Sequence, residues 1–128
     1  MSEYVSLPGL KADATLTQYR ACRITGAHTV GVISNANAQR PLGIVQNDPL
    51  VNEGVDIAVL GKCRGEYGGT VTAGDKLACN NTGQLITDAE VLDGSAVDLH
   101  HIALALESGS SGDVHYVYVF PPQMIGLE

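Results

Sequence analysis

The sequence predicts an all-β protein, a single small β-barrel-like or sandwich-like domain with an extended N-terminal arm, and three observations carry this prediction. Apolar residues alternate with polar or small ones in several short segments, which is the period of a strand with one face on a core. Runs rich in Gly, Asn and Asp, which are typical of turns, separate these segments. At 128 residues, the chain is long enough to form one core without a disulfide or metal.

The segment from Leu42 to Asn81 shows the alternation most clearly. Val55, Ile57 and Val59 take every second position there, which favours a strand with one buried face. A turn with glycine at position 74 then leads into the next strand. The strands predicted in this way are Thr29–Ser34, Leu42–Gln46, Val55–Cys63, Lys76–Cys79, Gln84–Thr87, His101–Glu107 and Val114–Phe120. The segment Leu16–Ile24 could form a helix or a strand, and its alternation favours a strand.

Two stretches repeat the same order of strand, polar loop with glycine, and alternating strand. They read GIVQNDPLVNEGVDIAV and IALALESGSSGDVHYVYV. We therefore expect two similar hairpins packed into one domain. Pro121 and Pro122 are expected to end the last strand, because proline cannot donate a hydrogen bond to a sheet. The acidic segment Asp88–Asp98 is expected to be a long loop.

Residues 1–17, the N-terminal arm, show no strand period, and Pro8 and Gly9 interrupt them. We expect this arm to be extended and the β-domain to comprise residues 18–128. Large apolar side chains are more frequent in the arm than a solvated tail needs, so they are expected to pack on a partner. These side chains are Tyr4, Val5, Leu7 and Leu10.

The formal charge of −7 is distributed unevenly along the chain. Residues 1–47 hold four basic and two acidic residues, whereas residues 48–128 hold three basic and twelve acidic ones. Nucleic-acid binding requires clustered Lys and Arg to neutralise phosphates, so no nucleic-acid partner is expected. The weakly basic leading part is instead suited to an acidic partner.

The three cysteines, at positions 22, 63 and 79, have no metal-ligand spacing. We expect three free thiols, buried as small apolar groups in a reducing compartment, although Cys63 and Cys79 could face each other on neighbouring strands. The sequence shows neither a signal peptide nor an apolar run long enough for a membrane span, so synthesis in a cytoplasm and no membrane partner are expected.

The search for catalytic chemistry finds no established motif. Asp98, His100 and His101 are potential metal ligands, but neighbouring strand residues point to opposite faces, so the two histidines are not expected to share an ion. The loop at residues 108–112 does not fit a nucleophile elbow. No catalytic residue, cofactor or metal is therefore expected, and a binding or structural role is favoured.

The order of these elements resembles the small capsid cement, or head decoration, proteins of tailed bacteriophages. The resemblance covers about Thr29 to Phe120. It is carried by a Gly-Ile strand, a Gly-Val strand ending in glycine, an Ala-Gly-Asp turn, a glycine hairpin and a closing pair whose first strand is rich in alanine. The matching positions are Gly43-Ile44, Gly54-Val55, Gly61, Ala73-Gly74-Asp75, Gly83, Ala103 to Ala105 and Gly112.

This resemblance implies a virion protein, often trimeric, that is made in the host cytoplasm and binds the outside of an icosahedral shell. There it would brace neighbouring subunits of the major capsid protein without a catalytic residue or cofactor. We expect an oligomer interface at Tyr116, Tyr118 and Phe120, unless these rings fill the core. The residues expected to contact the capsid are Tyr4, Val5, Leu7, Leu10, Arg20, Arg23 and Arg40.

Two alternatives remain open at the level of sequence. A carrier domain of the biotinyl or lipoyl type would present a modifiable lysine at a hairpin tip, and Lys76 is the candidate, although it is expected to begin a strand. A small β-barrel hydrolase or ligand-binding protein would use the histidines at positions 100 and 101.

Overall fold

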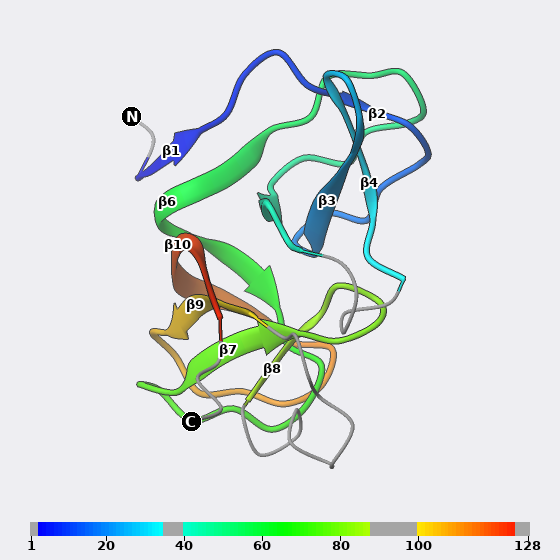
Figure 1. Ribbon diagram of the computed structural model, residues 1–128. Helices are drawn as coiled ribbons and strands as arrows, with labels where there is room; N and C mark the ends of the chain where they lie inside the picture. The colour runs from blue at the N-terminus through cyan, green and yellow to red at the C-terminus, as the bar shows by residue number, and fades with distance from the viewer. Residues whose placement is uncertain (1–2, 35–39, 88–99, 125–128) are drawn as a thin grey trace.

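The structure, a computed structural model, describes residues 3–34, 40–87 and 100–124. All regular structure in these residues is β, which confirms the predicted class (Figure 1). The described part contains no helix with the length and apolar character needed to cross a bilayer. The strands are β1 (Tyr4–Ser6), β2 (Lys11–Ala12), β3 (Ala21–Gly26), β4 (Thr29–Val32), β5 (Gly43–Val45), β6 (Ile57–Glu66), β7 (Lys76–Cys79), β8 (Leu85–Thr87), β9 (His100–Ala105) and β10 (Val114–Met124).

The strands form one sheet in the order β2-β4-β3-β5-β6-β10-β9-β7-β8, and β1 pairs with β6 beside this path. Only β2 and β4 pair in parallel among the described strands. Within the described residues the path ends at β2 and β8, so the sheet is not closed into a barrel. The domain is sandwich-like instead. The long strand β6 links the part formed by β2 to β5 with the part formed by β7 to β10 (Figure 1).

Each predicted strand overlaps an observed one. The two similar hairpins are β5–β6 and β9–β10, and both are antiparallel. They lie side by side because β6 pairs with β10 from Gly61 to Glu66. The turn before β7 has the expected conformation, with Gly74 at a φ of +97°. The sheet is therefore built around two hairpins joined through their second strands.

The structure differs from the expected strands in two places. Strands β1 and β2 were not foreseen, because segments of two or three residues have no measurable period. Strand β10 continues past Pro121 and Pro122 to Met124. Its pairing with β9 shifts between Val119 and Gln123, and the prolines stand in this irregular stretch, where a missing amide donor is tolerated. The predicted loop at 88–98 lies outside the described residues.

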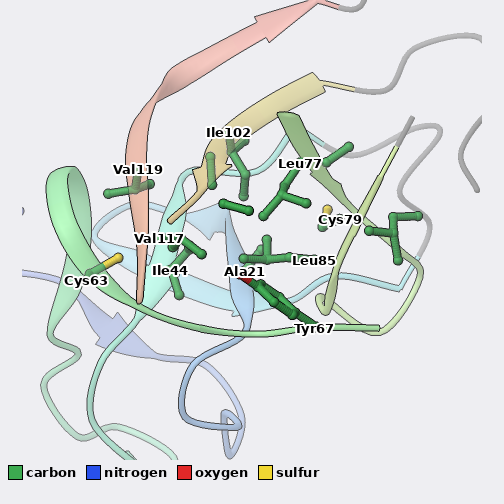
Figure 2. Close-up of a cluster of buried hydrophobic side chains, with 14 of the residues drawn as sticks. Ala21, Ile44, Cys63, Tyr67, Leu77, Cys79, Leu85, Ile102, Val117 and Val119 are labelled. Carbon is green, nitrogen blue, oxygen red and sulfur yellow. The ribbon is translucent and has the colours of Figure 1, made fainter. Parts of the chain in front are cut away.

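The core consists of two clusters of buried apolar side chains. The larger one is lined mainly by β6 to β10, with Ala21 of β3 and Ile44 of β5, and Figure 2 shows it. It is mainly aliphatic, as the composition indicates, with one aromatic exception. Tyr67 is fully buried, and its hydroxyl donates a hydrogen bond to the Glu107 carbonyl oxygen at 2.6 Å. This bond fixes the residues after β9 against those after β6.

The second cluster includes residues of the N-terminal arm. Ala12 and Leu16 are buried in it, and Leu10 packs against it. The backbone of residues 3–16 also bonds to distant segments, for example from the Leu16 amide to the Pro49 carbonyl. The arm is extended, and its residues 12 and 16 form part of the domain's core. Its assignment as a unit separate from residues 18–128 stays a prediction.

All three cysteines are free and buried, which confirms the prediction of three free thiols. Cys63 does not face Cys79, because β10 and β9 lie between their strands. Burial raises the pKa of each thiol to about 12. Since the thiolate is the reactive form, we expect no reaction of the native protein with a disulfide reagent at pH 8 and three reactive thiols in denaturant. A thiol that reacts at once in native protein would contradict this burial.

Candidate interaction surface

One face of the sheet presents cationic and aromatic side chains. Lys76 pairs with Leu104, Leu104 with Tyr118, and Tyr118 with Lys62, so the four side chains form a row across β7, β9, β10 and β6. Paired residues point to the same face of a sheet. The neighbouring row, Leu77, Ala103 and Val119, is fully buried. The first row therefore belongs to the opposite, outer face.

Tyr116 lies beside two cations on this outer face. The Lys62 ammonium is 4.6 Å from the centre of its ring, and the Arg64 guanidinium carbon is 5.1 Å from it. Arg64 also donates a hydrogen bond to the Tyr116 hydroxyl at 3.3 Å. The hydroxyls of Tyr116 and, to a lesser extent, Tyr19 raise the pKa of the Arg64 guanidinium. Both charges are thus held beside one tyrosine ring.

The rings of β10 do not fill the core. Val117 and Val119 are fully buried, whereas Tyr118, between them, is 40% exposed. The Tyr118 and Phe120 rings lie beside each other with centroids 6.1 Å apart. The alternative in which these rings are core residues is therefore wrong. The use of Tyr116, Tyr118 and Phe120 as an oligomer interface stays a prediction.

Three different segments form hydrogen bonds with the backbone of β6 next to this face. Residues 61–66 of β6 pair with β10, but the amides of Lys62, Arg64 and Glu66 donate to other segments. The Lys62 amide donates to the Glu3 carbonyl oxygen at 3.0 Å, and the Glu66 amide donates to the Tyr19 carbonyl oxygen at 2.8 Å. Between them, the Gln46 side chain accepts from the Arg64 amide and donates to the Arg64 carbonyl.

A cleft of about 390 Å³ opens where these segments meet. Tyr19 forms part of it in a left-handed conformation, with a φ of +71°, which is costly for a bulky side chain. Its amide donates to the Val45 carbonyl oxygen, so hydrogen bonds hold its backbone on both sides. We call this hollow the tyrosine cleft; its lining is Glu3, Tyr4, Tyr19, Gln46, Lys62, Cys63, Arg64 and Tyr116.

The apolar residues predicted for capsid contact fall into two groups. Tyr4 and Leu10 contact the domain itself, because the Tyr4 hydroxyl donates to Asp56 at 2.6 Å and Leu10 packs on the second cluster. Burial and the bond to Asp56 raise the pKa of Tyr4 to about 12. Val5 and Leu7 remain exposed at 56% and 37%.

The predicted arginines lie on segments other than β1. Arg20 forms an ion pair with Glu66 at 3.2 Å, and Arg23 on β3 donates to the Val32 carbonyl oxygen. Strands β5 and β6 separate β3 from β1 in the sheet. Arg40 is exposed.

The residues weighed for other chemistry are dispersed. Within the described ranges, no group of three or more His, Cys, Asp or Glu residues is placed to hold a metal ion. His100 and His101 are consecutive residues of β9. Lys76 begins β7, as expected, and does not stand at a hairpin tip.

Sequence reasoning missed Tyr19, Gln46, Lys62 and Arg64 as neighbours. Lys62 and Arg64 stand two positions apart in an alternating strand, which places both on one face. That signal was available, but their partners at positions 19 and 46 come from separate loops. The positive φ of Tyr19 could not be predicted, because no local sequence signal indicates it.

Comparison with known proteins gives a likeness in fold. No protein-family model matches the chain, and no curated protein matches it. Among solved structures, the fold is similar to that of the head fiber gp8.5 N base of bacteriophage phi29, with a TM-score of 0.64 and 17% sequence identity. The likeness covers 95% of this chain and 98% of that one, so the two domains share one fold nearly end to end.

Proposed function

We propose that this chain is a structural protein of a bacteriophage virion that binds the outside of the head shell and stabilises contacts between neighbouring major capsid subunits. The observation that carries the proposal is the fold likeness to a head fiber base over nearly the whole of both chains. The order of strands and turns resembles head decoration proteins and supports the same role from the sequence. Many weak contacts, one set per copy, would provide the binding strength.

The shell contact in this proposal uses exposed residues. Val5 and Leu7 of the N-terminal arm are apolar and accessible. Arg23 and Arg40 can approach an acidic shell surface, whereas Arg20 is engaged with Glu66. Tyr4 and Leu10 contribute indirectly, by fixing the arm on the domain.

A homotrimer is the oligomer we expect, with Tyr116, Tyr118 and Phe120 in its interface. Tyrosine suits an interface because its ring can be buried while its hydroxyl stays wet. Light scattering coupled to size-exclusion chromatography measures the mass directly. A mass three times that of the 13.4 kDa chain is expected, and a mass near 13.4 kDa at micromolar concentration would remove the trimer.

The neighbour's description favours a second form of the function, in which the domain is the attachment base of a projecting fiber. The two forms differ in their effect on the shell. A bracing protein should raise the temperature at which decorated heads release their contents, whereas an attachment base should bind without that gain. Heating bare and decorated heads side by side distinguishes them.

Co-sedimentation with undecorated heads tests the proposal itself. Purified protein is expected to pellet with heads in a saturable manner and to remain in the supernatant without them. Heads that already carry their full complement of the protein serve as the control. Failure to bind bare heads at any protein concentration would contradict both forms.

A further inference from the structure

We propose that the tyrosine cleft binds an acidic side chain of the shell protein, an inference that rests on the proposed function. The cleft brings two cations, three tyrosines and a side-chain amide to one hollow. The cations favour a carboxylate as the ligand. The net negative charge of the chain disfavours a nucleic acid as the partner.

Charge complementarity supports a carboxylate. Residues 48–128 hold only three basic residues, and Lys62 and Arg64 both line this cleft. Arg64 is oriented by the Tyr116 hydroxyl and by the Gln46 side chain on its backbone, so its fork of donors is ordered before a ligand arrives. An ordered guanidinium is well suited to a carboxylate.

The same geometry disfavours other ligands. Both cations already lie over the Tyr116 ring, and a sugar or base stacking on it would have to compete with them. A nucleic-acid backbone would bring many phosphates against a chain of net charge −7. A single carboxylate meets both cations without that repulsion.

The cleft already contains a stand-in for this ligand. The Glu3 carboxylate lies 3.5 Å from the Lys62 ammonium, and both side chains are about half exposed, at 57% and 48%. An exposed pair of this kind contributes little to stability. An incoming carboxylate can therefore replace Glu3 on Lys62 while Arg64 supplies a second contact.

Binding of matched variants to undecorated heads tests the inference. Removing one charge-assisted contact typically weakens affinity by roughly ten- to a hundredfold, so Arg64→Gln should lose that much. Glu3→Gln should bind more tightly than the unaltered protein, because it removes the internal competitor. Lys11→Gln and Asp48→Asn make the same charge changes at exposed positions outside the cleft and outside the cationic row, and should bind as the unaltered protein does.

The outcomes separate the two proposals. If the unaltered protein fails to bind heads, the proposed function is wrong. If it binds and Arg64→Gln binds equally well, or if Lys11→Gln weakens binding as much as Arg64→Gln, the cleft assignment is wrong. Equal gains from Glu3→Gln and Asp48→Asn would likewise overturn it, because net charge alone would then explain binding.

A substitution of the strained residue gives an independent test. Tyr19→Gly relieves the left-handed backbone and removes the hydroxyl, so melting temperature should change little while affinity for heads falls. Tyr19→Phe keeps the ring and should lose a smaller part of the affinity. A fall in melting temperature with unchanged binding would make Tyr19 a purely structural residue and remove it from the cleft's function.

Discussion

A chain that lacks residues 1–17 is expected to remain unfolded. The deletion removes Leu16 from the second core cluster, and loss of such a side chain alone costs roughly 2–5 kcal/mol. It also leaves backbone groups of distant segments without partners, including the amide of Val55 and the carbonyl of Pro49. A domain of this size has roughly 5–15 kcal/mol of stability in total. Circular dichroism should show loss of the β spectrum.

Two point variants test whether the arm stabilises the domain through its buried side chains. Leu16→Ala should lower the free energy of unfolding by roughly 2–5 kcal/mol, because the side chain is 2% exposed. Leu7→Ala, at 37% exposure, should change it by less than about 0.5 kcal/mol. Urea unfolding measures both. Equal effects, or a folded chain after the deletion, would show that the arm is not part of the core.

Replacing Tyr67 is expected to have the largest effect of any single substitution in the larger core cluster. Tyr67→Ala removes a fully buried ring and should cost roughly 3–5 kcal/mol. Tyr67→Phe keeps the ring but leaves the Glu107 carbonyl without its hydroxyl donor, which should cost roughly 1–3 kcal/mol. Urea unfolding of the two variants separates the packing contribution from that of the hydrogen bond.

Leu106→Ala is the control for this series. The Leu106 side chain is 44% exposed and is not part of the interface proposed for the trimer, so the loss of stability should be much smaller than at position 67. If the two alanine variants unfold at the same urea concentration, the distinction between the core and the outer face is wrong.

Alternation along the chain was sufficient to predict the strands that carry both hairpins. In Val114–Phe120, the odd residues Val117 and Val119 are buried and the even residue Tyr118 is exposed, because the strand period leaves no other arrangement once one face is in the core. The glycine at position 74 likewise indicated a turn, because glycine readily adopts the positive φ found there. These features follow from nearest neighbours in the sequence.

Features that depend on distant partners could not be predicted. Strands β1 and β2 are held by β6 and β4 and are too short to show a period of their own. Gly61, at a φ of +112°, lets β1 approach, since a β-carbon there would lie 2.7 Å from the Glu3 carbonyl oxygen. The tyrosine cleft likewise joins positions 3, 19, 46 and 64, and only folding brings these together.

Electron microscopy of undecorated heads mixed with the purified full-length protein tests the central claim most directly. The account predicts ordered additional density on the outer surface of the shell, repeated according to its symmetry, into which this sandwich-like domain fits with the tyrosine cleft against a capsid subunit. Heads without added density at saturating protein, or density only on the inner surface, would contradict it.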